Sequence, residues 1–291
     1  MPKIIFWNIQ RAGGDILSEV TDDLRDDLEA LGSNHNPDII ILCEGVGDLQ
    51  DNMVGNNCIP TSYSIEMVDS TYGDYTRTTT LRYIVMRRNN IQCSCYLIDG
   101  NHSSRPALLI CLGNECFLAM HAPSVTSTTK PQTEQMRFAH DRVRKLIRNN
   151  RLPLQHAPRM IFGDLNVNIR DQRKINSFRH HIQGSKISTF HMVDPGVGTH
   201  RNKNTRKYDT TLDWAYAEPG FNPVITVVEE TKKVDTKKRK PVNNYTRTKK
   251  KSKPNKFVQY KPQDFIDDDD DFTVTFENLK YPDHKPIMLE W

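Results

Sequence analysis

Short apolar runs separated by polar breaks recur along most of the chain. The runs are rich in β-branched and aromatic residues and are bounded by Gly, Asn or Pro, which is the pattern of β-strands. Two of them flank the Gly-Asn pair at 113–114 and predict a β-hairpin. The predicted strands are residues 3–7, 38–43, 81–86, 106–112, 116–121, 159–162, 212–217, 223–228, 272–276 and 285–291.

Two segments between these strands have the period of an amphipathic helix. In residues 15–31, apolar side chains recur every three or four positions, and Gly32 is the predicted C-cap. Residues 131–149 repeat this period, and Pro131 suits the first turn of a helix. Many strands with a few interspersed helices predict an α/β fold in which two sheets pack face to face between helices.

Charge changes this picture at residues 229–271, which are poor in apolar side chains. Residues 232–261 hold thirteen Lys or Arg and one acid, a net charge of +12; because the whole chain carries +4, the rest carries −8. An acidic run at 267–271 follows. Blocks of like charge are usually solvated, and a basic block attracts polyanions. Because strands lie on both sides, we predict a single domain, residues 1–291, with a basic then acidic insertion at 229–271.

Composition narrows the class of protein further. The longest apolar run, residues 39–43, is far too short to span a membrane, and the opening "PKIIFWN" lacks the features of a signal peptide. We therefore expect an intracellular protein, cytoplasmic or, if the clusters at 237–240 and 249–253 act as import signals, nuclear. Six cysteines indicate no disulfide framework, and Cys111 and Cys116 are expected to be buried thiols.

Polar residues of a few types gather where the predicted strands begin or end. One acid or amide after a strand is more often a simple turn. The recurrence of acids, amides and histidines at six strand ends instead predicts that these residues share one site. The positions are Asn8, Gln10, Glu44, His121, Asp164, Asn166, Asp213, Asp283 and His284.

The acids and amides in this set suit a hard cation. Glu44 and Asp283 are the predicted ligands of Mg²⁺, or alternatively Mn²⁺, with Asn8 and Gln10 as neutral partners close to the metal. Mg²⁺ keeps water molecules and binds phosphate oxygens, which predicts a phosphoester substrate. Zinc is less favoured because the set has no thiolate cluster and no His-x-x-x-His pair.

The histidines in the set suit acid–base chemistry. His284 paired with Asp213 is the predicted general base, which takes a proton from water. His121 is predicted to hydrogen-bond or protonate a phosphate oxygen. Asp164 and Asn166 are predicted to orient the attacking water and to bind the scissile phosphate.

Six segments in chain order resemble the motifs of the endonuclease/exonuclease/phosphatase superfamily: "FWNIQ", "ILCEG", "MHAPS", "FGDLN", "TTLDWAY" and "PDHKP". Residues 104–122 are more narrowly similar to the catalytic subunit of cytolethal distending toxins. The resemblance covers residues 3–228 and 272–291. Two positions depart from it, because Pro282 replaces a Ser and Cys43 replaces the Gln that usually precedes the Glu.

The resemblance implies a four-layer α/β/β/α sandwich with the site at one end of two packed mixed sheets. It implies a Mg²⁺-dependent phosphodiesterase that acts as a DNA endonuclease and nicks its substrate. A phosphoinositide phosphatase or an RNase on the same fold, and an inactive polyanion-binding module, are the alternatives. It further implies that Arg105 and Arg77 bind substrate phosphates.

Overall fold

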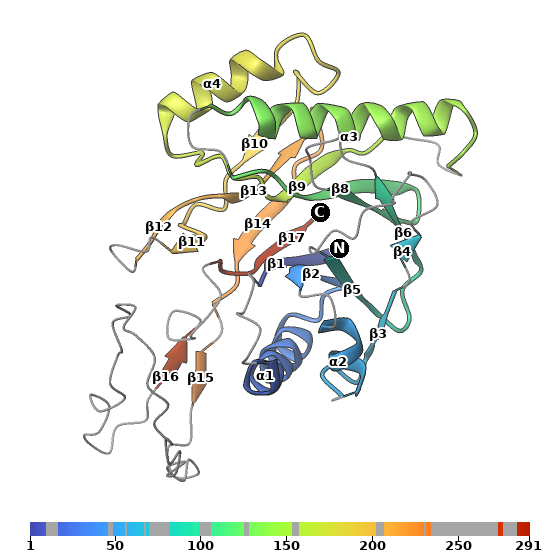
Figure 1. Ribbon diagram of the computed structural model, residues 1–291, viewed down its shortest axis with the longest axis vertical. Helices are drawn as coiled ribbons and strands as arrows, with labels where there is room; N and C mark the ends of the chain where they lie inside the picture. The colour runs from blue at the N-terminus through green and yellow to red at the C-terminus, as the bar shows by residue number, and fades with distance from the viewer. Residues whose placement is uncertain are drawn as a thin grey trace, which may run out of the picture. The chain divides into compact units, whose positions relative to one another are not determined.

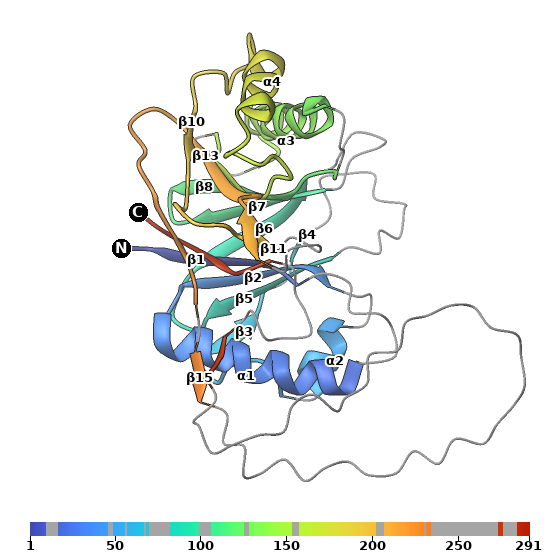
Figure 2. The same cartoon turned by 90° about the vertical axis from the view of Figure 1, so that its left-hand side faces the viewer.

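The computed structural model describes residues 1–9, 17–45, 49–55, 57–66, 68–69, 82–98, 106–124, 128–152, 157–201, 207–229, 231–233, 273–275 and 284–291. The chain divides into two compact units, Met1–Glu230 with Lys280–Trp291, and Thr231–Leu279. In the first unit, two sheets pack face to face and helices cover the outer side of each (Figure 1) (Figure 2). This arrangement confirms the predicted α/β/β/α sandwich.

The first sheet contains six described strands, in the order β14-β17-β1-β2-β5-β3. Its central strand β1 runs parallel to β2 and antiparallel to β17, so the two ends of the chain pair with each other. The strands are β1 (Lys3–Asn8), β2 (Ile39–Gly45), β3 (Tyr63–Ile65), β5 (Arg82–Arg88), β14 (Val224–Val227) and β17 (Ile287–Glu290).

The second sheet contains seven described strands, in the order β10-β13-β9-β8-β7-β6-β4. Strands β7 and β8 form the hairpin that the sequence predicts, and β9 lies between its parallel neighbour β8 and its antiparallel neighbour β13. The strands are β4 (Val68–Asp69), β6 (Cys93–Ile98), β7 (Ala107–Leu112), β8 (Glu115–His121), β9 (Met160–Asp164), β10 (His191–Val193) and β13 (Asp213–Ala217).

Two short antiparallel pairs complete the described strands. In the first unit, β11 (His200–Arg201) pairs with β12 (Tyr208–Thr210). In the second unit, β15 (Thr231–Lys233) pairs with β16 (Thr273–Thr275), which falls within the strand predicted at 272–276. The description of 229–271 as an insertion in a single domain stays a prediction.

Two helices cover each sheet. Helices α1 (Leu17–His35) and α2 (Leu49–Gly55) lie against the first sheet, whereas α3 (Lys130–Arg148) and α4 (Gln172–Ile182) lie against the second (Figure 1). Pro131 occupies the first turn of α3, as predicted. Of the described helices, none combines the length and the apolar character that crossing a bilayer requires.

The prediction that Gly32 caps α1 is wrong. The helix continues to His35, and Asn36 takes the left-handed conformation, with φ 47°, that ends it. Gly32 instead lies inside the helix where α1 approaches a neighbouring loop. A Cβ at this position would lie 3.2 Å from the Tyr63 ring and 3.4 Å from Pro60, so the glycine allows a close approach rather than a turn.

The cysteines are free, as expected, and none forms a disulfide. Cys111 and Cys116 are direct partners across β7 and β8, are both buried, and have Sγ atoms 3.2 Å apart. The hydrogen bond between the two thiols, together with burial, raises the pKa of Cys111. This pair therefore belongs to the core.

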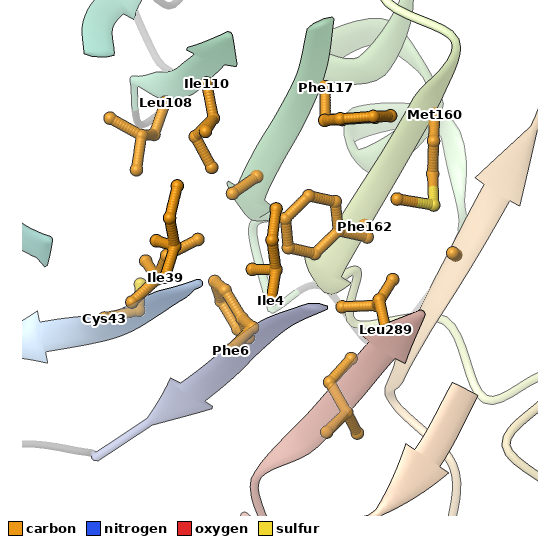
Figure 3. Close-up of a cluster of buried hydrophobic side chains, with 14 of the residues drawn as sticks. Ile4, Phe6, Ile39, Cys43, Leu108, Ile110, Phe117, Met160, Phe162 and Leu289 are labelled. Carbon is orange, nitrogen blue, oxygen red and sulfur yellow. The ribbon is translucent and has the colours of Figure 1, made fainter. Parts of the chain in front are cut away.

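The main core fills the space between the two sheets (Figure 3). Because side chains alternate along a strand, Ile4 and Phe6 of β1 point toward the second sheet, and Met160 and Phe162 of β9 point toward the first. The rings of Phe6 and Phe162 meet edge to face, with centroids 6.0 Å apart. A second cluster lies between the second sheet and helices α3 and α4.

Gly163 makes the contact between Phe6 and β9 possible. Its φ is 122°, a conformation that residues with a Cβ rarely adopt. A Cβ there would lie 2.3 Å from the Met120 carbonyl oxygen and 3.0 Å from the Phe6 ring. At this position β9 can therefore lie beside β8 and against Phe6 of the first sheet only without a side chain.

We predict that Gly163→Ala lowers the free energy of unfolding by about 3 kcal/mol or more, because the new methyl group adds both a clash and backbone strain. The matched control is Gly113→Ala, since Gly113 also has a positive φ, 59°, but has nothing within 4 Å of the added Cβ. Strain alone should cost about 1–2 kcal/mol there. Urea unfolding measures both variants, and equal losses would contradict the clash.

Candidate active site

Asp164, the last residue of β9, is the centre of a buried polar cluster. Its direct partner on β8 is His121 and its direct partner on β13 is Asp213. Residues paired across neighbouring strands point to the same face of a sheet, so the three side chains form a row facing the first sheet. Each is at most 5% exposed. Nε2 of His121 lies 3.3 Å from Oδ2 of Asp164.

The first sheet meets this row through Asn8, the last residue of β1. Asn8 follows Ile4 and Phe6 on the same face of the strand and is 1% exposed. Its amide Nδ2 donates a hydrogen bond of 2.9 Å to Oδ2 of Asp164. The two sheets are therefore joined by apolar contacts along β1 and by a polar contact, between Asn8 and Asp164, at the end of β1.

His284 and Asp213 form a buried pair beside Asp164. Nδ1 of His284 lies 2.8 Å from Oδ2 of Asp213, and because a carboxylate only accepts, Nδ1 carries the proton. Nε2 of His284 then faces Oδ2 of Asp164 at 3.7 Å, which is too far for a direct hydrogen bond. Oδ1 of Asp213 is buried and has no hydrogen-bond partner among the described residues.

Asn166 is held at the edge of the cluster by two hydrogen bonds. It has a positive φ of 51°, which brings its backbone N–H to 3.1 Å from Oδ1 of Asp164. Its side-chain Nδ2 donates to the Ala122 carbonyl oxygen at 2.8 Å. Asn166 is only half-buried, whereas Asp164 is fully buried, so it lies on the outer side of the cluster.

Thr199 supports the His284–Asp213 pair, and the sequence predicts no role for it. Its buried hydroxyl oxygen accepts hydrogen bonds from the backbone N–H groups of Leu212, at 3.1 Å, and Asp213, at 3.0 Å. Its carbonyl oxygen accepts from the N–H of Lys285 at 2.8 Å. One threonine therefore fixes the backbone at Asp213 and next to His284. No sequence signal marks it, because a threonine in a loop is unremarkable until its partners are known.

Three further side chains position the histidines. Trp7 is buried and donates from Nε1 to the His284 carbonyl oxygen at 3.1 Å. The Tyr83 hydroxyl accepts from the backbone N–H of His121 at 3.0 Å. The ring of His200 packs against the ring of His284, with centroids 4.7 Å apart.

Glu44 is described only through its backbone, which lies beside Asn8. β1 and β2 run parallel, Asn8 pairs with Cys43, and the N–H of Ile9 donates to the Cys43 carbonyl oxygen at 3.0 Å. The pairing of β2 with β5 shifts register between Leu42 and Gly45, the interval that contains Glu44. The other predicted positions, Gln10, Arg77, Arg105 and Asp283, lie outside the described residues.

The described residues contain two arrangements with metal-ligating atoms. Ligand atoms of Asp164, Asp213 and His284 lie within 4.8 Å of one another. Two of these groups, however, already share the hydrogen bond of the His284–Asp213 pair. The second arrangement is the shared edge of β1 and β2, where Asn8 and the backbone of Glu44 lie at neighbouring positions. Hard amide and carboxylate oxygens fit Mg²⁺ better than the mixed first group does.

Solved structures of known proteins share this fold. A protein of the endonuclease/exonuclease/phosphatase family from Bacteroides thetaiotaomicron has a TM-score of 0.59 and 13% identity, with 99% of this chain and 93% of that chain covered. A mannosyl-6-phosphatase from the same organism has a TM-score of 0.58 and 13% identity, with 100% and 99% covered. The cytolethal distending toxin of Haemophilus ducreyi has a TM-score of 0.53 and 12% identity, with 99% and 96% covered.

The likeness to these proteins lies in the fold. No family model and no curated protein sequence matches the chain. At 12–13% identity, the structures confirm the resemblance to the endonuclease/exonuclease/phosphatase superfamily at the level of architecture.

We predict that Thr199→Val lowers the free energy of unfolding by about 2–3 kcal/mol, because it leaves two buried N–H groups without an acceptor. Thr199→Ser keeps the hydroxyl and should cost less than about 1 kcal/mol. Urea unfolding of the two variants measures the difference. A loss for Thr199→Val no larger than that for Thr199→Ser would contradict the role of the hydroxyl, because only the Val variant lacks it.

Proposed function

We propose that this protein is a metal-dependent phosphodiesterase, and specifically a DNA endonuclease that nicks its substrate. The observation that carries the proposal is the buried cluster in which the His284–Asp213 pair faces Asp164 across 3.7 Å. A histidine with one nitrogen fixed by a carboxylate and the other directed at a second carboxylate is suited to activating water.

His284 is the proposed general base. Its Nδ1 donates to Asp213, so the lone pair is on Nε2, and Asp213 stabilises the imidazolium that forms when Nε2 takes a proton. The gap between Nε2 and Asp164 suits a water molecule placed to one side of both groups. In this arrangement Asp164 accepts a hydrogen bond from the water and directs its oxygen toward the phosphorus, while His284 takes the other proton.

Asn8, Asn166 and His121 complete the proposed site. Asn8 donates to Oδ2 and the Asn166 N–H donates to Oδ1, so Asp164 is held by both oxygens while it orients the water. His121 and the half-buried amide of Asn166 are the proposed partners of the phosphate oxygens. His121 is suited to supply a proton or a hydrogen bond as charge builds on the phosphate.

Glu44, Asn8 and Asp283 are the proposed ligands of a Mg²⁺ or Mn²⁺ ion. The neighbouring ends of β1 and β2, which bring Glu44 beside Asn8, support this assignment. When bound, the ion would neutralise negative charge on the scissile phosphate. Arg105 and Arg77 are proposed to hold further phosphates of the substrate.

DNA is the proposed substrate because of the charge of the chain and the toxin-like segment. Residues 232–261 carry +12, which suits a long polyanion better than a single phosphate. Residues 104–122 resemble the Arg-Pro strand and hairpin of the toxin catalytic subunit. The choice of DNA as the substrate therefore depends on sequence features, whereas the proposed hydrolysis depends on the buried cluster.

We predict that the protein nicks supercoiled plasmid with Mg²⁺ and is inactive when a chelator is added. Asp164→Ala and His284→Ala should each lower the nicking rate by about a hundredfold or more, which is the usual contribution of a general base. Gel electrophoresis of the plasmid measures the rate, and Ser33→Ala, at an exposed position of α1, is the control.

The same preparations should be tested on single-stranded RNA, inositol phospholipids and a phosphorylated sugar. If any of these substrates is hydrolysed faster than DNA, that substrate replaces DNA in the proposal, and the proposed hydrolytic mechanism is retained. Nicking by both alanine variants at the wild-type rate would contradict the proposed site itself.

We predict that replacing residues 232–261 with a Gly/Ser linker of equal length weakens DNA binding, far more at low salt than at high salt. Each lost contact between a cation and a phosphate lowers the slope of log K against log salt by about 0.9. Fluorescence anisotropy of a labelled duplex between about 50 and 300 mM salt measures the slope. Equal slopes with and without the segment would show that it plays no part in binding.

A further inference from the structure

The two helical layers of the sandwich carry opposite charge. Helices α3 and α4 together hold nine Lys or Arg and two acids, a net charge of +7. Helices α1 and α2 together hold one Arg and seven acids, a net charge of −6. The sheets between them separate the two layers, so the charge is segregated by face (Figure 2).

Five cations of the positive layer are exposed. Arg144, Lys145 and Arg148 lie in the last two turns of α3, and Arg173 and Arg179 lie on α4. Among the described residues, none of these five side chains pairs with a carboxylate, whereas Lys130 at the start of α3 does, with Glu134. Unpaired charges of one sign on one surface repel each other, so this layer lowers stability unless an anion binds to it.

The positive layer begins at the proposed active site. Helix α4 starts six residues after Asn166, and α3 starts nine residues after His121. The exposed Arg170 is four residues from Asn166, a separation of at most about 14 Å along the chain. The two helices also touch, because the Thr129 hydroxyl bonds to Ser177 at 2.9 Å and Arg137 donates to the His181 carbonyl oxygen.

We propose that the outer face of α3 and α4 is a second contact surface for the phosphate backbone of duplex DNA, continuous with the site where the strand is cut. The proposal rests on the nuclease function proposed above and adds the path of the substrate. From Lys130 to Arg148 the helix rises about 27 Å, so a single phosphate cannot neutralise these cations, but a duplex with a charge every 1.7 Å or so can. The net negative charge of α1 and α2 disfavours the opposite path.

Charge reversal tests this surface. The probe is a duplex of about 30 base pairs, which is about three helical turns. We expect each of two double variants to bind it about tenfold more weakly near 50 mM salt. The variants are Arg144→Glu with Arg148→Glu, and Arg173→Glu with Arg179→Glu. Each pair should also lower the salt slope by about 2. Binding is measured by anisotropy without divalent metal, so that cleavage does not enter, and urea unfolding checks that each variant is folded.

A charge-restored variant separates the surface from the net charge of the protein. Asp26 and Glu29 are exposed on α1, so adding Asp26→Lys and Glu29→Lys to the Arg144/Arg148 pair returns the net charge to the wild-type value. Duplex binding should stay weak in this variant. Recovery to wild-type affinity would overturn the proposal, because net charge alone would then explain the effect.

Two further measurements distinguish the partner and the underlying function. Bis(4-nitrophenyl) phosphate is a diester too small to reach from the active site to α3 and α4. Its rate of hydrolysis should therefore be unchanged in both charge-reversal pairs. Loss of binding to phosphatidylserine vesicles with unchanged duplex binding would overturn the proposal in favour of a membrane. If wild type does not nick DNA but the pairs still lose duplex affinity, the surface stands and the nuclease proposal falls. If wild type nicks and the pairs bind as wild type does, the surface proposal falls.

Discussion

The contact between β1 and β9 is the constraint on which the site depends. Along this contact, Phe6 meets Phe162, and one step further Asn8 meets Asp164. Because side chains alternate with a period of two, the apolar pairs and the polar pair are parts of one register. A shift of β9 by one residue would turn Phe162 out of the core and Asp164 away from the first sheet together. The energy that buries the core therefore also places the carboxylate.

Strand pairing extends that placement to the neighbouring residues. Since Asp164 pairs with His121 on one side and Asp213 on the other, fixing one strand fixes a row of three functional groups. His284 arrives from the other end of the chain, and β17, which pairs with β1, brings it there. Trp7 and Thr199 hold its backbone and that of Asp213 by hydrogen bonds. Paired strands thus position the two aspartates, and buried loop contacts position His284.

The sequence predicted the strands, the sandwich and the gathering of polar strand ends because these depend on local apolar periodicity and on motif order. It did not predict β6, whose mixed residues are only partly buried, or α4, which buries Ile175, Phe178 and Ile182 alone. It misplaced the end of α1 because the sequence does not distinguish a glycine that permits close packing from a glycine that caps a helix. Thr199 and Tyr83 were beyond reach, since their role lies in contacts between distant segments.

The cluster also shows where stability has been given up. Asn8, His121, Asp164, Asp213 and His284 are each at most 5% exposed, and burying such groups is unfavourable unless they are hydrogen-bonded. Most of their atoms have partners, but Oδ1 of Asp213 has none among the described residues. The hydrogen bonds that Asn8, Asn166 and Thr199 donate or accept around Asp164 and Asp213 offset part of this cost. The polar row can therefore lie in the interior, directly at the end of the apolar contact between the sheets.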